Sequence, residues 1–462
     1  MMRALRLSEL QSSMPGALQG QLNGDASFNR ICTDTRHLNT GELFVALSGE
    51  HFNGNNFALK AAELGAVALV VSEQQATTLP QWVVNDTQLA LAHIAAMNRQ
   101  QFNGPLIALT GSAGKTSTKD MLAAILSECG EVLATAGTFN NEIGVPLTLL
   151  NLSSEHCFAV IEMGAAKAGD ISYLCQFAKP NIAIVTNAGS AHLEGFGSVD
   201  VIAKTKGAIF ESLAADGIAI INVDDVFAEQ WLAQAGKAGV KTFSVGDDRA
   251  DVFAAHCQPA GVNGWRFDLC ANNETVAIEL PLLGQHNIAN ALAAAAAAIA
   301  AGASLQQVQA GLAKVRAVDG RLNLHSINEA LTVIDDSYNA NPDSVKAAID
   351  VLAELGPDSC LVLGNMGELG PQAVQLHHDI GAYAGEKNIK QLITLGPSAD
   401  AVAAGFGGHA IVCKNHQQVI EACRQQCQQG VVLVKGSRSA AMENVVAGLV
   451  PADSNAAMGE FH

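Results

Sequence analysis

LIALTGSAGKTSTK, residues 106–119, joins a short apolar run to a helical pattern through a glycine-rich turn. The apolar run is typical of a buried strand, and the turn reads Gly111-Ser-Ala-Gly-Lys115-Thr116. Glycines let the backbone turn tightly, so that successive N–H groups and a helix N-terminus point toward an anion. A lysine adds a positive charge and a threonine adds a hydroxyl for Mg²⁺. The stretch therefore predicts a strand, a phosphate-binding loop and a helix.

The match to the full G-x-x-x-x-G-K-[ST] pattern is incomplete. Leu109 occupies the position of the first glycine, and Gly111 lies only three residues before Gly114. A glycine-rich strand-to-helix turn without a ligand is the alternative interpretation. If the loop binds a nucleotide, its contacts come from Gly111, Ser112, Ala113, Gly114, Lys115, Thr116 and Ser117.

Length and charge limit the possible functions. The 462 residues exceed what one hydrophobic core usually serves, and hydrophobic residues make up 49% of them against 15% charged. Lys and Arg number only 26 against 44 Asp and Glu, which gives a formal net charge of −18. Because nucleic-acid binding needs a basic surface, this charge disfavours a nucleic-acid partner. Any polyanionic ligand must be held by local basic groups.

Cysteine usage and hydropathy point to a reducing compartment. The ten cysteines include no C-x-x-C pair, so neither a zinc site nor a disulfide framework is indicated. The N-terminal residues lack the apolar core of a signal peptide. The only long apolar run, residues 288–303, is mostly alanine and is interrupted by Asn290, as expected of a packed helix. We expect a cytoplasmic monomer that is not embedded in a membrane.

Three units follow from the order of strand and helix patterns. Residues 1–103 hold short β-like runs at 43–47 and 68–72 with helical patterns between them, which predicts a small α/β domain. Residues 104–317 begin after a turn signal and contain continuous apolar strands at 106–110, 156–161, 182–186 and 217–222. Such strands predict a mostly parallel sheet covered on both faces, of the type that carries phosphate-binding loops. The shorter alternating pattern from 245 to 283 predicts antiparallel strands added to it.

Residues 318–462 form the third predicted unit. Strands at 331–335, 359–363, 391–395 and 430–434 alternate with helical segments, which predicts a compact doubly wound, Rossmann-like sheet. The fold class is therefore α/β with three domains.

Polar residues at strand ends are the candidate site residues, because functional groups gather there in parallel sheets. Glu162 follows a strand and could approach a metal beside the phosphate loop, or it could cap a helix or face solvent. His192 could bind a metal or be an ordinary loop residue. Lys204 and Lys206 lie on an expected helix, where solvated charges are the simpler interpretation, although a lysine near two cations could be neutral or modified.

Further candidates lie beyond residue 280. Asn287 and Asn290 could cap a helix or recognise an adenine edge. Arg321, at the start of the third unit, could reach a phosphate from across a cleft. The polar run 335–342, DDSYNANP, suggests a site directly after a strand, with an Asx turn into the next helix as the alternative.

Taken together, the chain resembles the Mur ligase family along nearly its whole length. The resemblance rests on the order of Asp34-Thr-Arg36, GELFVA, TGSAGKTS, NNEIGVP, Glu162, His192, Lys206, GQHNIAN, DGR and DDSYNANP. Members of this family are ATP-dependent amide-forming enzymes of peptidoglycan precursor synthesis. They share the missing first glycine, so the departure at Leu109 favours the family. NNEIGVPLTLL and DDSYNANP are similar to the member that adds D-alanyl-D-alanine to UDP-N-acetylmuramoyl-tripeptide.

The resemblance implies a role for each candidate. ATP would contact the phosphate loop, Asn287, Asn290, Arg321 and Asp336, and Mg²⁺ would be held by Thr116, Glu162, His192 and Lys206, the last as a carbamate. Lys115, Glu162, His192 and Lys206 would be catalytic. The two organic substrates would contact Thr33, Asp34, Thr35, Arg36, Asn140, Asn141, Tyr338, Asn339, Asn341, Lys435 and Arg438. Another Mur-type or folylpolyglutamate-synthetase-like ligase, or a non-catalytic ATP switch, are the alternatives.

Overall fold

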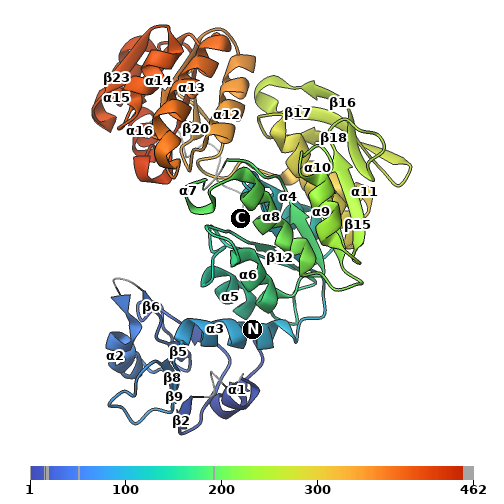
Figure 1. Ribbon diagram of the computed structural model, residues 1–462, viewed down its shortest axis with the longest axis vertical. Coiled ribbons are helices and arrows are strands. Elements are labelled where there is room, and N and C mark those ends of the chain that lie inside the picture. Colours follow the sequence, from blue (N-terminus) through green and yellow to red (C-terminus); the bar gives the residue numbers. More distant parts are fainter. Residues whose placement is uncertain (1, 15, 17–19, 50–51, 191–192, 451–462) are drawn as a thin grey trace.

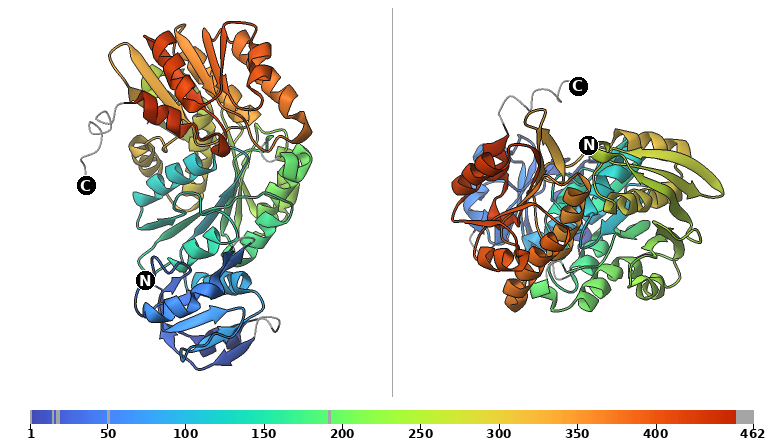
Figure 2. Two further views of the ribbon diagram at one scale, coloured as in Figure 1. Left: turned by 90° about the vertical axis from the view of Figure 1, so that its left-hand side faces the viewer. Right: turned by 90° about the horizontal axis from the view of Figure 1, so that it is seen from above.

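Three bodies are arranged along the long axis of the molecule, with the chain running from one end to the other (Figures 1 and 2). The computed structural model describes residues 2–14, 16, 20–49, 52–190 and 193–450. Among these residues, no helix combines the length and the apolar composition that crossing a bilayer would need. The α/β class with three domains, expected from the sequence, is confirmed.

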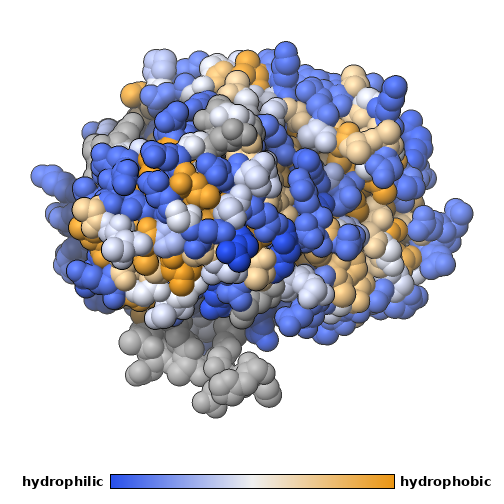
Figure 3. Space-filling model, turned by 90° about the horizontal axis from the view of Figure 1, so that it is seen from below, coloured by the Kyte–Doolittle hydropathy of each residue, from blue (hydrophilic) through white to orange (hydrophobic). Residues whose placement is uncertain are grey.

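The N-terminal domain is built on a five-stranded sheet of order β2-β9-β8-β5-β4. Its elements are β1 Leu5–Arg6, α1 Leu7–Ser13, β2 Gln21–Asn23, β3 Ser27–Phe28, β4 Ile31–Cys32, β5 Leu43–Val45, β6 Ser48–Gly49, β7 Phe52–Asn53, the 3-10 helix η2 Gly54–Phe57, α2 Ala58–Glu63, β8 Ala68–Val71, β9 Gln81–Val83 and α3 Thr87–Arg99. Seen from below, the molecule shows a mainly hydrophilic face with interspersed apolar patches (Figure 3).

Helix α3 fastens this domain to the next one. Arg99, only 8% exposed, donates from Nε to the Ala178 carbonyl at 2.8 Å and from Nη2 to the Asn181 Oδ1 at 3.0 Å. Asn98 Nδ2 donates to the Leu149 and Leu152 carbonyls. Moving a buried guanidinium away from these acceptors would break several hydrogen bonds to a charged group. The contact between the first two domains is therefore expected to be rigid.

The central domain carries a nine-stranded sheet of order β11-β12-β10-β13-β14-β15-β16-β17-β18. Its elements are β10 Leu106–Thr110, α4 Lys115–Ser127, β11 Val132–Ala134, α5 Gly144–Leu150, β12 Phe158–Glu162, α6 Asp170–Ala178, β13 Ile182–Val185, α7 Leu193–Phe196, α8 Val199–Glu211, β14 Ile218–Asn222, α9 Ala228–Ala235, β15 Gly239–Ser244, β16 Val252–Pro259, the 3-10 helix η3 Gly261–Asn263, β17 Trp265–Ala271, β18 Glu274–Leu280, α10 His286–Ala300 and α11 Leu305–Lys314.

Strand β10 shows why the central strands are apolar throughout. Ile107 and Leu109 point into one buried cluster, with α4 and the alanine-rich α10, while Leu106 and Ala108 point into the cluster on the opposite face. Both faces of the parallel part are therefore covered, as the sequence predicts. The pairing from β11 to β16 is parallel, and the hairpin pairings of β16 with β17 and of β17 with β18 add antiparallel strands to the same sheet, as expected.

The C-terminal domain has a six-stranded sheet of order β19-β20-β24-β21-β22-β23, parallel except for β19. Its elements are β19 Asn323–Ser326, β20 Leu331–Asp336, α12 Pro342–Glu354, β21 Ser359–Leu363, the 3-10 helix η4 Gly370–Gln372, α13 Ala373–Glu386, β22 Gln391–Leu395, α14 Ala399–Phe406, β23 Ala410–Cys413, α15 His416–Gln426, β24 Gly430–Lys435, the 3-10 helix η5 Arg438–Ala440 and α16 Glu443–Leu449. Helices cover both faces, which confirms the doubly wound expectation.

Candidate active site

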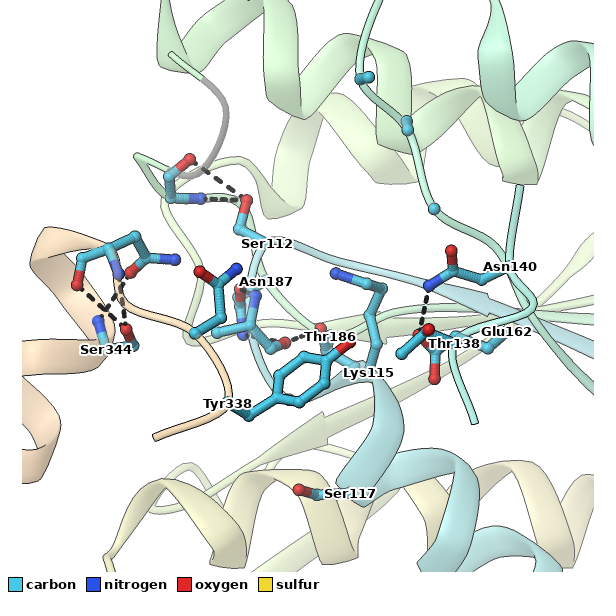
Figure 4. Close-up of a pocket in the computed structure, with 18 of the residues that line it drawn as sticks. Ser112, Lys115, Ser117, Thr138, Asn140, Glu162, Thr186, Asn187, Tyr338 and Ser344 are labelled. Atoms are coloured by element: carbon cyan, nitrogen blue, oxygen red, sulfur yellow. Dashed lines mark hydrogen bonds between the residues drawn. The ribbon is translucent and has the colours of Figure 1, made fainter. Parts of the chain in front are cut away.

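A cleft of about 1360 Å³ is lined by residues of all three domains. The N-terminal domain contributes Asp86, Gln88 and Leu89 at the start of α3. The central domain contributes the phosphate-loop region and the loops that follow β11, β12 and β13, and the C-terminal domain contributes residues near 320, 338 and 343 (Figure 4). Because the carboxyl ends of β10, β12 and β13 meet here, the cleft lies where parallel sheets place their functional groups.

The glycine-rich turn has the geometry of an anion-binding loop. Gly114 precedes the first residue of α4 with a left-handed φ of 78°, and no side chain caps this helix. A Cβ at Gly114 would lie 2.3 Å from the Asn290 Oδ1, so glycine is required at this position. Because the first N–H groups of an uncapped helix need an acceptor, the start of α4 favours an anion.

Thr186 and Asn187, which follow β13, hold the loop from one side. Asn187 accepts from the Ser112 N–H at its carbonyl (3.1 Å) and from the Ala113 N–H at Oδ1 (2.9 Å), and it donates to the Ala113 carbonyl (3.1 Å). Thr186 Oγ1 donates to the same Ala113 carbonyl at 2.6 Å. Two loop N–H groups are thus used within the protein. Sequence reasoning missed both residues, whose one signal was their position after an apolar strand.

Two lysines, the buried Lys206 and the partly buried Lys115, converge on the loop. Nζ of Lys115 and Nζ of Lys206 donate to the same carbonyl oxygen, that of Gly111, at 2.8 and 3.0 Å. Burial lowers the pKa of Lys206 well below its usual value, and the charge of Lys115 lowers it further. Burial also lowers the pKa of Lys115. The interpretation of Lys206 as a solvated helix charge is therefore wrong, since this residue is 1% exposed, whereas Lys204 is exposed.

Glu162 ends β12 inside the protein, with 1% of its surface exposed. Its Oε1 accepts from the Asn140 Nδ2 at 2.7 Å, while Oε2 is buried and has no hydrogen-bond partner in the described structure. The alternatives of a helix cap or a solvent-facing carboxylate are therefore wrong. Asn141 has a local role, because its Oδ1 accepts from the Gly144 N–H at 2.9 Å at the start of α5.

Arg321 crosses from the C-terminal domain to the loop. Its Nη2 donates to the Thr116 Oγ1 at 3.1 Å, and its guanidinium lies 4.7 Å from the ring centroid of Tyr338. Its Nε is buried without a partner in the described structure. Tyr338 and Lys115 both line the cleft (Figure 4). An arginine with a spare donor at this position is suited to a phosphate oxygen.

The polar run after β20 divides into two parts. Asp336 pairs with Lys435, whose Nζ lies 2.6 Å from Oδ2 and also donates to the Asn339 carbonyl. Burial raises the pKa of Asp336, and Lys435 opposes that rise. Asn341 instead caps α12, with its Oδ1 accepting from the Ser344 N–H at 2.8 Å. The Asx-turn alternative therefore holds for Asn341, which lines the cleft together with Asp336, Tyr338 and Asn339.

Asn287 and Asn290 are buried beside the loop. Asn290 Nδ2 donates to the Asn287 Oδ1 at 2.9 Å, and Asn287 Nδ2 donates to the Leu283 carbonyl at 2.8 Å. Helix α10 has no side-chain cap, so the capping alternative is wrong. Their neighbour His286, by contrast, is exposed and lines the cleft.

The remaining candidates differ in their relation to the cleft. Asp34 and Arg36 form an exposed ion pair at 2.6 Å, which lowers the pKa of Asp34 to about 2, and residues 33–36 are not among the lining residues. Arg438 pairs with Glu443 at 3.2 Å behind Tyr338. Ser117 lines the cleft. His192 lies outside the described residues.

Comparisons with known proteins agree with this arrangement. Residues 27–104 match the family model "Mur ligase family, catalytic domain", residues 109–298 match "Mur ligase middle domain", and residues 320–438 match "Mur ligase, glutamate ligase domain". The UDP-N-acetylmuramoyl-tripeptide--D-alanyl-D-alanine ligase of Escherichia coli is 44% identical over 97% of this chain and 99% of its own length. The chain belongs to the Mur ligase family.

The fold of this Mur ligase is also similar to those of solved structures. The crystal structure of MurF from Acinetobacter baumannii has a TM-score of 0.90 and 34% identity, covering 97% of this chain and 99% of that one. MurF from Thermotoga maritima, solved in complex with ADP, has a TM-score of 0.82 and 25% identity, covering 91% and 96%.

Proposed function

We propose that this chain is an ATP-dependent, ADP-forming ligase that joins D-alanyl-D-alanine to the terminal carboxylate of UDP-N-acetylmuramoyl-tripeptide in peptidoglycan synthesis. The observation that carries the proposal is the cleft, where a glycine-rich loop with the partly buried Lys115 and the buried Lys206 faces Arg321 of another domain. The identity of the substrates is supported by the relative from Escherichia coli, whose name states that reaction and which spans the whole chain.

The chemistry requires an activated carboxylate. A carboxylate resists attack by an amine because it is negatively charged and has no good leaving group. The tripeptide carboxylate oxygen therefore attacks the γ-phosphorus of ATP, the bond to the ADP oxygen breaks, and an acyl phosphate forms. The D-alanyl-D-alanine amine then attacks the acyl carbon, and the tetrahedral intermediate collapses to amide and inorganic phosphate as the amine loses its proton.

The chain's own groups suit the first step. Lys115, the start of α4 and the spare Nε of Arg321 place positive charge and donors where the transferred phosphoryl group needs them. Because Arg321 belongs to the C-terminal domain, the site is complete only when that domain is seated against the loop. Seating also excludes water, which protects the acyl phosphate from hydrolysis.

The residues present fit Mg²⁺. The buried Glu162 Oε2 has no hydrogen-bond partner in the described structure, and carboxylate and hydroxyl oxygens are ligands that this ion prefers. Glu162, Thr116 and a carbamate on Lys206 would hold the ion, with His192 as a further ligand. When bound, Mg²⁺ neutralises developing charge on phosphate oxygens. Carbamylation joins the neutral amine to CO₂ and releases a proton, and the lowered pKa of Lys206 favours the neutral amine.

Glu162→Gln tests the metal assignment. The glutamine Oε1 can still accept from Asn140, so the fold is preserved, but the charge is lost. We expect the Mg²⁺ concentration for half-maximal ADP release to rise by about tenfold or more. The affinity for Mn²⁺ in the presence of a non-hydrolysable ATP analogue, measured by electron paramagnetic resonance, should fall in parallel.

Glu142→Gln is the matched control, since Glu142 is an exposed carboxylate lining the same cleft. Equal metal requirements in the Glu162 variant and the wild type would contradict the assignment.

The other domains complete the proposal. Residues 1–103 bind the UDP end of the substrate through Thr33 to Arg36 and residues 43–46, residues 104–317 bind ATP, and residues 318–462 bind the dipeptide and part of the nucleotide. The organic substrates are contacted by Asn140, Asn141, Tyr338, Asn339, Asn341, Lys435 and Arg438. ATP is contacted by Asn287, Asn290 and Asp336. The chain acts as a monomer in the cytoplasm and supports cell shape and division through cell-wall synthesis.

Substrate dependence tests the function directly. Phosphate release from ATP, followed in a coupled assay, should require D-alanyl-D-alanine together with a UDP-N-acetylmuramoyl-tripeptide, with either meso-diaminopimelate or lysine as the third residue. Stimulation by glutamate with a folate would instead favour a folylpolyglutamate-synthetase-like activity. Binding of ATP without turnover across the acceptor panel would favour a nucleotide switch.

A further inference from the structure

Asp343, in the first turn of α12, bridges the C-terminal domain to the loop after β13. Its Oδ2 accepts from both the N–H and the Oγ–H of Ser190, each at 2.8 Å. The two residues are 153 positions apart in the chain. Hydrogen bonds to an ionised carboxylate are stronger than neutral ones, so this pair favours the seated position of the domain.

Gly189 connects this bridge to the phosphate loop. Its N–H donates to the Ser112 Oγ at 2.9 Å, and its carbonyl accepts from the same hydroxyl group at 3.2 Å. Ser112 is the second residue of the glycine-rich turn. A continuous set of hydrogen bonds therefore runs from Asp343 through the backbone of Ser190 and Gly189 to the loop.

The Asp343 carboxylate lies close to the backbone of Gly189. A Cβ at Gly189 would lie 2.6 Å from the Asp343 Oδ2, while the next residue met among those that the structure describes, apart from the chain neighbours, is Ser112, with its Cβ 3.8 Å away. No left-handed backbone requires glycine here. Within the described residues, the close obstacle to a side chain at this position is the Asp343 carboxylate, and moving that carboxylate would break its bonds to Ser190.

We propose that Asp343 is a positioning residue that couples seating of the C-terminal domain to the geometry of the phosphate loop. It contacts neither nucleotide nor acceptor in this assignment. It fixes Ser190 and Gly189, and through them Ser112, at the moment when Arg321 reaches the loop. The proposal rests on the proposed function, since it assumes that the loop holds the phosphates of ATP.

Four variants break or preserve this contact in different ways. Asp343→Ala removes the acceptor and should lower kcat for ADP release about tenfold, the effect of losing hydrogen bonds to a charged group. Asp343→Asn keeps an acceptor oxygen in place and should retain most of the activity. Gly189→Ala should displace the carboxylate and cost as much as Asp343→Ala. In the double variant Gly189→Ala/Asp343→Ala, the methyl group meets no carboxylate and should add no further loss.

Asp400→Ala is the matched control, because Asp400 is an exposed acid in the first turn of α14, another helix of this domain. Its kcat should equal that of the wild type. Thermal unfolding verifies that each variant is folded. The KM for the UDP substrate should be unchanged in the Asp343 variants, because that substrate's UDP end is assigned to the N-terminal domain.

Seating is measured separately by small-angle X-ray scattering with a non-hydrolysable ATP analogue and Mg²⁺. We expect Asp343→Ala to have a larger radius of gyration than the wild type at the same analogue concentration. Equal radii, or losses from Gly189→Ala and Asp343→Ala that multiply independently, would overturn the coupling. A wild type without substrate-dependent ADP release would instead overturn the proposed function, so the two failures are distinguishable.

Discussion

Lys115→Ala should reduce ATP-dependent phosphate release by about a thousandfold, the scale of losing a preorganised charge at a developing anion. Lys115 is the first residue of α4, and its ammonium donates a hydrogen bond to the Gly111 carbonyl. Both residues belong to the turn that the sequence predicts to bind phosphates. Lys115 is partly buried at the wall of the cleft, and desolvation lowers its pKa. A partly desolvated cation beside a glycine-rich turn is suited to an anionic ligand.

Two measurements distinguish this outcome from a damaged fold. The thermal unfolding midpoint of Lys115→Ala should stay near or above that of the wild type, because the variant removes a desolvated cation. Binding of a non-hydrolysable ATP analogue, followed by calorimetry, should weaken together with turnover. Turnover near the wild-type rate would contradict the assignment of the loop.

Lys206→Ala should lower turnover by about a hundredfold, because its carbamate is the proposed ligand that completes the metal site. A small added carboxylate, such as acetate or formate, should restore part of the activity by filling the space left by the side chain. Wild-type enzyme freed of CO₂ should lose activity and regain it when bicarbonate is added. Activity that is indifferent to both treatments would contradict the carbamate.

The matched control is Lys204→Ala, on the same helix but exposed to solvent. It should retain wild-type turnover and show no rescue. Lys206→Met fills the same space without a charge, so it should be at least as stable as the wild type while staying inactive. Loss of stability in Lys206→Met would show that the lysine is needed for folding.

The sequence was sufficient for the architecture because the strands that matter are apolar throughout. β10, β21 and β22 begin and end at the predicted residues, and all residues of β10 and β21 are buried. Predictions missed β11, β15 and β23, which are short or only partly apolar. Strands of this kind are defined by their neighbours in the sheet, and a local window of sequence does not contain those neighbours.

The candidate site shows the same division. The glycines, the lysine and the helix at residues 106–119 predict an anion-binding turn from local backbone chemistry alone. Any segment with the same residues at the same spacing would give this prediction. The residues that contact this turn come from distant parts of the chain. Asn187 accepts a hydrogen bond from the loop backbone, Asn290 packs against Gly114, and Arg321 donates to Thr116. No spacing rule links these residues, because sheet order and domain seating bring them together.

By itself, the sequence determined the class of fold, the strand, glycine-rich turn and helix at residues 106–119, and the family, since each depends on residues that are close in the chain or on the order of motifs. Only the tertiary structure decided that Lys206 is buried beside Lys115 while Lys204 is exposed, although both lie on one helix. It also decided that Asn341 caps α12 and that Asp336 pairs with Lys435. The physical reason is that burial and charge pairing depend on what packs against a side chain, and those neighbours come from segments that are distant in the chain and meet only in the folded protein.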